Sequence, residues 1–262
     1  MATAELNGVT LAYDDLGPAG APRTILLLHG FSSNRNEGWR RTGWYGAMER
    51  RGTRVIALDQ RGHGESAKPH DPAAYGREQL AADAMALLDH LGVSRCDVLG
   101  YSMGTRTAMQ AALDAPGRVS NLLLGGVGGR LFDPAPVAGE TLADAMRAVD
   151  PETIRTPLLR SFRQFADEQG EDRLALAACT EAVSPPLAPS DLARLPMPVL
   201  VFAGARDELA GDPQVLASCF PNGRAISLAG CDHFSAIPHA GAKAAVFDFL
   251  DGLLDDDFPP FE

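Results

Sequence analysis

Short apolar runs alternate with segments of helical periodicity along most of this 262-residue chain, and this alternation constrains its fold more than any other feature. A largely apolar run is expected of a strand that is buried on both faces of a parallel sheet. The predicted strands cover residues 24–28, 54–58, 96–99, 119–124, 198–203 and 225–228. The predicted helices cover residues 43–51, 77–91, 102–115, 213–219 and 240–253. Alternation of this kind predicts a mostly parallel sheet with helices on both faces.

The chain begins differently, with a pair of residues typical of a tight hairpin. Asn7 and Gly8 stand between two short runs of alternating apolar residues. Asn-Gly is the strongest short-range signal for a two-residue turn between antiparallel strands. We therefore predict an N-terminal antiparallel hairpin, which brings the expected sheet to eight strands.

The alternation stops between residues 129 and 189, where helical patterns separated by prolines replace the strands. The apolar positions that share a helical face there are Leu142, Met146 and Val149, and then Leu158, Phe162 and Phe165. We interpret this segment as a helical lid inserted into the sheet domain. The predicted organisation is therefore a core over residues 1–128, a lid over 129–189 and the rest of the core over 190–262.

The composition argues against several classes of protein. Apolar residues make up 45% of the chain and charged residues 22%, as in an ordinary globular domain. The net charge of −11 opposes a surface that binds nucleic-acid phosphates. No apolar run approaches the roughly 20 residues that span a bilayer, and residues 1–8 do not resemble a signal peptide. Four cysteines without metal-binding spacing indicate reduced thiols, so a cytoplasmic protein is expected.

A G-x-S-x-G pattern at residues 100–104 directly follows the strand predicted at 96–99 and directly precedes the helical residues 105–115. At such a turn a serine is held in a strained conformation that exposes its hydroxyl at the edge of the sheet, and the glycines allow backbone segments to approach closely. Ser102 is therefore the candidate nucleophile. The alternative is that Ser102 only caps the following helix.

A serine nucleophile needs a base, and the base needs a group that fixes its tautomer. Of the six histidines, His233 follows the last predicted strand, where a loop can reach Ser102. Asp207 follows the strand at 198–203 and emerges at the same edge of the sheet, with Glu208 as the neighbouring alternative. Either predicted residue can instead be an ordinary loop side chain.

Two backbone N–H groups must also face the oxyanion that forms during acyl transfer. One is the amide of Met103 at the start of the helix, and the other is the amide of Phe31, in the turn after the strand at 24–28. His29 and His63 stand in glycine-flanked turns, where an imidazole ring usually braces loop backbone.

Five ordered motifs make the sequence resemble the α/β-hydrolase family, in the serine-nucleophile branch that carries a helical cap. They are residues 29–31 (HGF), 59–66 (DQRGHGES), 100–104 (GYSMG), 204–207 (GARD) and 232–234 (DHF). The resemblance implies the α/β-hydrolase fold and a Ser-Asp-His order of catalytic residues. It leaves the substrate open, because the branch includes esterases, lipases, thioesterases, C–C bond hydrolases, enol-lactonases and cofactor-free haloperoxidases.

Two residues depart from the family pattern. Thr105 stands where the family often has a second glycine, and Asp232 stands where it usually has a glycine before the histidine. We expect Thr105 to tighten the packing behind the nucleophile and Asp232 to alter either the pKa of the base or its loop. Epoxide hydrolases and haloalkane dehalogenases of this fold place an aspartate where this chain has Ser102, which argues against both chemistries.

Several side chains outside the motifs are candidates for the substrate pocket. The predicted pocket residues are Trp39, Trp44, Tyr101, Phe162 and Phe234. For the two tryptophans the alternative is that they anchor their loop on the core. The lid arginines are predicted to lie on solvated helix faces rather than to bind a substrate carboxylate; they are Arg155, Arg160 and Arg163.

The remaining motifs predict no cofactor. The glycine-rich run at 125–129 lacks the order of a nucleotide-binding turn and is interpreted as a flexible connection into the lid. Cys231 and His233 lack the further ligands that a metal site needs. We therefore expect neither a metal nor an organic cofactor.

Together these features predict a serine hydrolase that cleaves a small or medium carboxylic ester or thioester through an acyl-enzyme on Ser102. The alternative within enzymes is a C–C bond hydrolase of a vinylogous diketo acid. The alternative outside enzymes is a receptor that keeps the fold as a ligand pocket. A small-molecule partner is expected in each case, no nucleic acid is expected, and the oligomeric state is left open.

Overall fold

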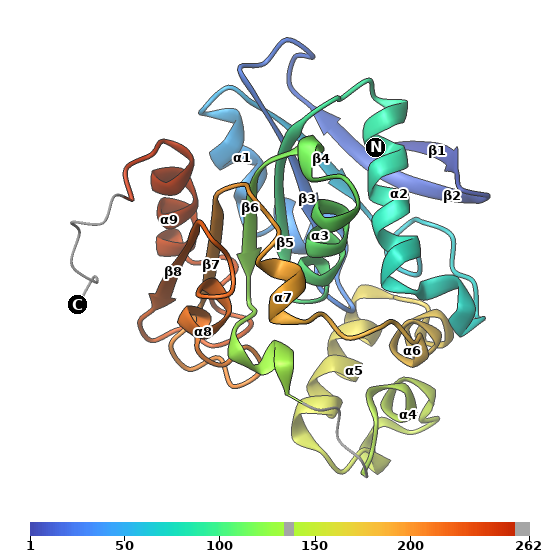
Figure 1. Ribbon diagram of the computed structural model, residues 1–262. Helices are drawn as coiled ribbons and strands as arrows, with labels where there is room; N and C mark the ends of the chain where they lie inside the picture. Colours follow the sequence, from blue (N-terminus) through green and yellow to red (C-terminus); the bar gives the residue numbers. More distant parts are fainter. Residues whose placement is uncertain (134–138, 255–262) are drawn as a thin grey trace.

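The computed structural model describes residues 1–133 and 139–254, and in these ranges eight strands form one sheet (Figure 1). The strands are β1 (Ala2–Leu6), β2 (Val9–Leu16), β3 (Arg23–Leu28), β4 (Thr53–Leu58), β5 (Cys96–Tyr101), β6 (Val119–Gly125), β7 (Val199–Gly204) and β8 (Gly223–Leu228). Their order in space is β1-β2-β4-β3-β5-β6-β7-β8. β2 pairs antiparallel with β1 and β4, and all other pairs are parallel. The predicted fold class is confirmed.

The N-terminal hairpin turns at the predicted pair of residues. Leu6 pairs with Val9, so only Asn7 and Gly8 lie in the turn. Both have positive φ, 51° and 77°, as a two-residue turn of the hairpin type requires. The hairpin places β2 antiparallel beside β4 at one side of the parallel strands.

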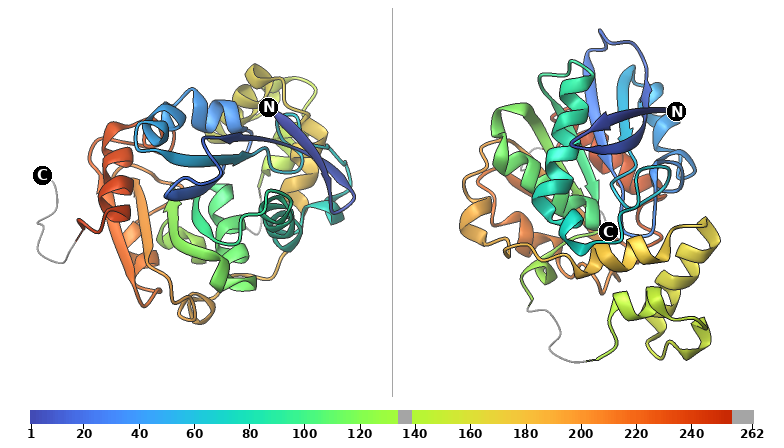
Figure 2. Two further views of the ribbon diagram at one scale, coloured as in Figure 1. Left: turned by 90° about the horizontal axis from the view of Figure 1, so that it is seen from above. Right: turned by 90° about the vertical axis from the view of Figure 1, so that its right-hand side faces the viewer.

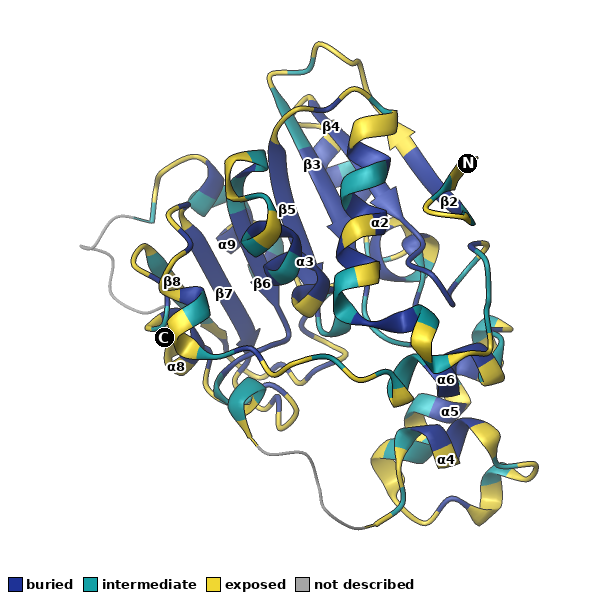
Figure 3. Ribbon diagram, turned by 45° about the vertical axis from the view of Figure 1, so that its right-hand side comes forward, coloured by how far each residue is buried: buried dark blue, intermediate teal, exposed yellow. Residues whose placement is uncertain are grey.

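Helices cover both faces of the sheet (Figure 2). One face is covered by α2 (Arg77–His90), α3 (Met103–Asp114) and α8 (Pro213–Ala217), and the other by α1 (Trp44–Glu49) and α9 (Ala240–Leu250). Alternate side chains of a strand point to opposite faces. In β3, Leu26 and Leu28 pack beneath the first set of helices, whereas Ile25 and Leu27 pack beneath the second. The central strands are therefore buried on both sides, as Figure 3 shows.

The connection from β6 to β7 contains helices only, in the part of it that the structure describes. The α-helices are α4 (Leu142–Arg147), α5 (Pro157–Gln169), α6 (Arg173–Glu181) and α7 (Pro189–Leu192), with shorter helical turns at Gly129–Phe132 and Pro151–Thr153. α4, α5 and α6 lie together beyond the carboxyl ends of the central strands (Figure 1). α7 does not belong to this group of helices, because its residue Leu192 packs into the hydrophobic core between the sheet and the helices α2, α3 and α8. The division at residues 129 and 189 stays a prediction.

The apolar face predicted for α4 is wrong at Val149. The helix ends at Arg147, the backbone leaves the helical conformation at Ala148, and Val149 is 96% exposed. Leu158 of the second predicted face is also exposed. The buried side chains of α4 instead pack on one another and on the next two helices, through Ala143, Met146, Ala166, Leu176 and Ala177.

No helix of the described ranges combines the length and the apolar character that crossing a bilayer needs.

Candidate active site

Ser102 lies in the sharp turn between β5 and α3, at the carboxyl edge of the sheet. Its φ of 52° and ψ of −116° fall in a region that residues with a side chain rarely adopt, at a cost of about 1–3 kcal/mol. The two glycines of the motif allow this turn. A Cβ on Gly100 would lie 2.4 Å from the carbonyl oxygen of Gly104, and one on Gly104 would lie 2.1 Å from that of Leu28. The Ser102 N–H donates to the Gly125 carbonyl oxygen at 2.8 Å, which ties the turn to β6.

Ser102, His233 and Asp207 form a continuous chain of hydrogen bonds. Ser102 Oγ lies 2.9 Å from His233 Nε2, and His233 Nδ1 lies 2.8 Å from Asp207 Oδ2. A carboxylate can only accept, so Nδ1 carries the proton and Nε2 presents its lone pair to the hydroxyl. This geometry lets the imidazole accept a proton from the serine. The Ser102 side chain accepts no hydrogen bond from the backbone N–H groups in the first turn of α3, all of which the structure describes. The alternative that Ser102 only caps this helix is therefore not supported.

The acid is held rigidly by the backbone around it. Asp207 is 4% exposed and follows β7, and its Oδ1 accepts from the N–H groups of Leu209 at 3.0 Å and Ala210 at 2.9 Å. Those bonds leave Oδ2 aimed at His233, which is 8% exposed. Glu208, the sequence-based alternative, is exposed.

The loop after β3 runs directly beside the nucleophile. A Cβ on Gly30 would lie 3.3 Å from Ser102 Cβ, so only the bare backbone of glycine fits there without a shift. Neither the Phe31 N–H nor the Met103 N–H donates to an acceptor within residues 1–133 and 139–254. Met103 is the first residue of α3, where the helix dipole adds a partial positive charge. Both amides are thus available beside Ser102, and their role as oxyanion donors stays a prediction.

Two buried histidines support the loop that carries Phe31. His29 Nε2 accepts from the Gln60 N–H at 3.0 Å, so its Nδ1 donates to the Gly30 carbonyl oxygen at 2.8 Å. The His63 ring lies with its centroid 5.2 Å from that of His29 and 5.8 Å from that of Phe31. Burial lowers the pKa of His29 to about 4 and that of His63 to about 3, so both rings are neutral near pH 7. These contacts agree with the prediction that the rings brace loop backbone.

The two departures from the family pattern make local hydrogen bonds beside His233 and Ser102. Asp232 accepts from the Phe234 N–H at 3.1 Å and from the N–H and hydroxyl of Ser235 at 2.8 and 2.6 Å. Those bonds lower the pKa of the Asp232 carboxyl and shape the turn around His233. Thr105 Oγ1 donates to the Ser102 carbonyl oxygen at 2.5 Å, which tightens the first turn of α3.

The glycine-rich run after β6 packs closely and is not the flexible connection that we predicted. A Cβ on Gly126 would lie 2.8 Å from the Tyr101 ring and 3.2 Å from the His233 ring. A Cβ on Gly128 would lie 2.7 Å from the Asp212 carbonyl oxygen. The run needs glycine because the rings and loops beside the site leave no room for side chains. Tyr101, in turn, donates its hydroxyl to the His233 carbonyl oxygen at 2.6 Å.

A cavity of about 200 Å³ opens above Ser102 and His233. Its apolar walls are formed mainly by Phe31, Phe162, Phe165, Phe234, Ile237 and Pro238. Phe162 of α5 lies between Phe31 and Phe234, with ring centroids 6.0 and 5.7 Å away. Three predicted pocket residues, Tyr101, Phe162 and Phe234, therefore line the cavity. Phe165, Ile237 and Pro238 were not predicted as pocket residues.

Trp39 and Trp44 do not line the cavity, so the pocket prediction is wrong for them. Both are fully buried and pack edge to face, with ring centroids 5.9 Å apart, in the apolar cluster under α1 and α9. Trp44 Nε1 donates to the Ile237 carbonyl oxygen at 2.9 Å. The alternative interpretation, that they anchor the loop after β3 on the core, fits these contacts.

The prediction that the lid arginines lie on solvated helix faces is wrong for Arg163. Arg163 is buried in α5, where it donates to the carbonyl oxygens of Ala145 and Ala148 at 2.9 and 2.6 Å and pairs with Asp167. It therefore joins α4 to α5 and is not free to bind a substrate.

No group of three or more histidine, cysteine, aspartate or glutamate side chains is arranged to hold a metal ion in the part of the chain that the structure describes.

Comparisons with known proteins match most of the chain. A family model described as "alpha/beta hydrolase fold" matches residues 23–177. The chain is 34% identical over 168 residues to the sn-1-specific diacylglycerol lipase ABHD11 of Mus musculus, which covers 63% of this chain and 52% of the lipase. It thus spans about half the length of the curated relatives it matches.

Solved structures match along almost the whole length of both chains. The structure of Est816, described as an N-acyl homoserine lactone degrading enzyme, has a TM-score of 0.74 and 26% identity and covers 97% of this chain and 100% of that one. The enol-lactonase from Burkholderia xenovorans LB400 has a TM-score of 0.73 and 26% identity and covers 95% of this chain and 100% of that one.

Proposed function

Because the chain belongs to the α/β-hydrolase family, we propose that it is a serine hydrolase that cleaves small or medium carboxylic esters or thioesters through an acyl-enzyme on Ser102. The observation that carries this proposal is the unbroken hydrogen-bond chain from Ser102 through His233 to Asp207. It joins a strained, accessible hydroxyl to a base whose tautomer is fixed by a buried carboxylate.

In the proposed reaction, Ser102 Oγ attacks the ester carbonyl carbon while His233 Nε2 takes the hydroxyl proton. The negative charge of Asp207 stabilises the imidazolium, and the amides of Phe31 and Met103 bind the oxyanion. His233 then gives the proton to the leaving alcohol or thiol, which leaves an acyl group on Ser102. Water attacks that acyl group with His233 again as the base, and the acid is released.

The lining of the cavity favours an uncharged substrate. None of the described residues that form it is an arginine or a lysine, and its one charged side chain is the carboxylate of Glu37. A diketo acid would bring its own carboxylate into this site without a cation to pair with. The names of the similar proteins, a diacylglycerol lipase, an enol-lactonase and a lactone-degrading enzyme, support ester or lactone substrates.

A rate series on p-nitrophenyl esters of increasing acyl length, together with one vinylogous diketo acid, tests the proposal. The wild-type protein should hydrolyse the shorter esters, and Ser102→Ala and His233→Ala should each lose at least about 10⁴-fold in kcat. His239→Ala is the matched control and should leave the rate unchanged, because the His239 side chain caps α9 and is not among the described residues that line the cavity.

Four outcomes would contradict the proposal. Activity that survives Ser102→Ala would remove the nucleophile, and loss in His239→Ala instead of His233→Ala would mean that another ring is the base. Cleavage of the diketo acid alone would indicate a C–C bond hydrolase. Turnover of no ester at all, with slow labelling by a fluorophosphonate, would indicate a receptor.

A further inference from the structure

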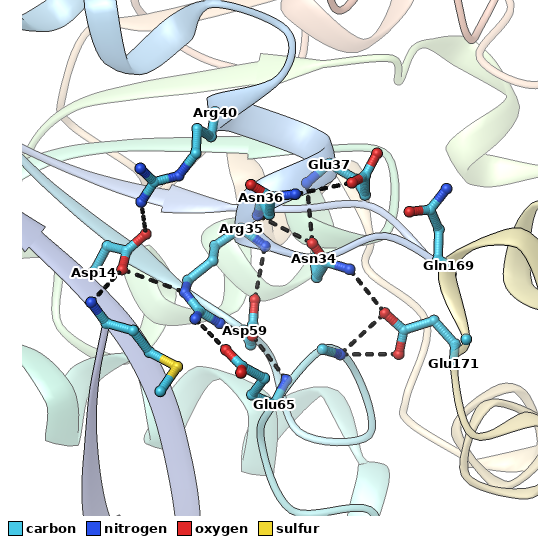
Figure 4. A pocket seen from close by; sticks show the side chains of 13 residues that line it. Asp14, Asn34, Arg35, Asn36, Glu37, Arg40, Asp59, Glu65, Gln169 and Glu171 are labelled. Carbon is cyan, nitrogen blue, oxygen red and sulfur yellow. Dashed lines mark hydrogen bonds and ion pairs between the residues drawn. The ribbon is translucent and has the colours of Figure 1, made fainter.

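A second cavity, of about 460 Å³, lies where the turn between α5 and α6 meets two loops of the core (Figure 4). Its walls are polar, unlike those of the catalytic cavity, and include Asn34, Arg35, Glu37, Asp59, Glu65 and Glu171. Glu37 lines both cavities, so the two are neighbours. A change at this junction can therefore reach the catalytic cavity.

Most charge in this second cavity is paired, and Glu171 is held differently. Arg35 pairs with both Asp59 and Glu65. Glu171 accepts hydrogen bonds from neutral donors: Asn34 Nδ2 lies 3.0 Å from one oxygen, and the Gly64 N–H lies 2.9 and 3.1 Å from the two. Figure 4 shows the carboxylate between these two loops.

Glu171 is only 7% exposed, and its hydrogen bonds from Asn34 and Gly64 hold it in this buried position. The pKa of the Glu171 carboxyl is raised, mainly by burial and also by the charge of Asp59. The hydrogen bonds from Asn34 and Gly64 and the charge of Lys68 lower this pKa but do not offset the rise. Movement of this turn away from the core breaks the hydrogen bonds from Asn34 and Gly64, which are stronger than neutral ones because the acceptor is charged. The attachment of this side chain to the core therefore resists displacement.

Glu171 is also fixed to the helix that closes the catalytic cavity. Gly170 ends α5 in the left-handed conformation, with φ of 67°, and the Glu171 N–H donates to the Ala166 carbonyl oxygen at 3.0 Å. Phe165 and Phe162, which line the catalytic cavity, lie about one and two turns before the end of this helix. Glu171 therefore lies at the end of the same helix that carries these two rings.

A neighbouring contact also joins this turn to the core. His70 Nε2 lies 3.0 Å from Asp172 Oδ2. Both side chains are partly exposed, and a solvent-exposed pair of this kind contributes little. Glu171 is therefore the stronger attachment.

We propose that Glu171 is a positioning residue that ties α5 to the core loops and so sets the largest acyl group that fits beneath Phe162. The kinetic consequence rests on the proposed function, whereas the attachment is a property of the fold. With the tie intact, Phe162 stays between Phe31 and Phe234 and the cavity keeps its small volume. Without it, α5 moves away from Ser102 and longer acyl groups enter.

Two single substitutions break the tie in opposite ways. E171Q replaces one of the two acceptor oxygens with an amide donor, which must then face either Asn34 Nδ2 or the Gly64 N–H. N34D sets a second carboxylate against Glu171, while the retained oxygen still accepts from the N–H groups of Asn36 and Glu37. If one variant fails to fold, the other still tests the same contact.

The double variant N34D/E171Q provides the rescue. In it the glutamine amide donates to the new carboxylate, and the glutamine oxygen still accepts from Gly64, so the hydrogen bond returns with its direction reversed. E181Q is the matched control for the chemical change, because Glu181 pairs with Arg147 of the neighbouring helix α4.

The first measurement is hydrogen exchange of the α5 amides, which needs no enzymatic activity. We expect exchange to be at least about tenfold faster in E171Q and N34D than in the wild type, and unchanged in N34D/E171Q and E181Q. The second measurement is the ratio of kcat/KM for p-nitrophenyl octanoate to that for p-nitrophenyl acetate. This ratio should rise about tenfold in each single variant and return to the wild-type value in the double variant.

Unchanged exchange in both single variants overturns the tie, whatever the activity. Faster exchange with an unchanged ester ratio overturns the control of acyl size. A double variant that behaves like the single variants also overturns the proposal, because a general loss of stability would then explain them. If the wild type hydrolyses no ester but the exchange results hold, the proposed function fails while the positioning of α5 is supported.

Discussion

Replacing Ser102 with glycine should abolish hydrolysis and still give a more stable protein than replacing it with alanine. Both substitutions remove the hydroxyl and its hydrogen bond to His233, so those losses cancel in the comparison. The backbone at φ 52° and ψ −116° costs alanine about 1–3 kcal/mol and costs glycine little. Glycine also loses about 0.5–1 kcal/mol through the greater freedom of the unfolded chain. The net expectation is a glycine variant that is more stable by about 1 kcal/mol.

Urea unfolding of the two variants measures this difference, and thermal unfolding should show a Tm higher by about 2–4 °C in the glycine variant. Ser161 provides the matched control, because it is an exposed residue inside α5 with ordinary helical geometry. There, glycine should be less stable than alanine by about 1 kcal/mol. A glycine variant at position 102 that is no more stable than the alanine variant would refute the claim that the turn is strained.

Three further results are expected. Lowering the pH from 7 to 5 should reduce the free energy of unfolding by about 2 kcal/mol for each of His29 and His63. Burial lowers the pKa of these two rings to about 4 and about 3. Below the ordinary histidine pKa near 6.5 the unfolded chain therefore binds more protons than the folded chain, and the stability present at pH 7 is lost as the pH falls. Urea unfolding of His63→Gln should show a pH dependence smaller by about 2 kcal/mol, and an unchanged dependence would contradict this. Asp207→Asn should stay folded but lose about 10⁴-fold in kcat, because its amide faces His233 Nδ1 and imposes the wrong tautomer; a loss below tenfold would show that the acid is dispensable. Phe162→Ala should raise kcat/KM for the octanoyl ester over the acetyl ester about tenfold, and an unchanged chain-length profile would show that this ring does not limit acyl size.

The features that the sequence predicts correctly are those that neighbouring residues determine. The hairpin needs only Asn7 and Gly8, whose positive φ angles make the turn. Each buried strand is marked by its own apolar run. The turn at Ser102 requires glycines two residues away on either side, so its position can be read from five consecutive letters.

The features that the sequence does not predict depend on contacts between distant segments. Asn34 and Gly64 lie 137 and 107 residues from Glu171, and no local pattern marks a glutamate after a helix as their partner. Trp39 and Trp44 have the composition of a pocket wall, but the loop after β3 folds them onto the core. The glycines at 125–129 have the composition of a flexible segment, yet rings and loops from other parts of the chain require them.

Mass spectrometry of the protein after reaction with a fluorophosphonate tests the central claim most directly. Wild-type protein should gain one phosphonyl group per chain, located on the peptide that contains Ser102, and Ser102→Ala should gain none. His233→Ala should react far more slowly, because the hydroxyl then lacks its base. A phosphonyl group on another residue, or equal labelling of Ser102→Ala, would contradict the account.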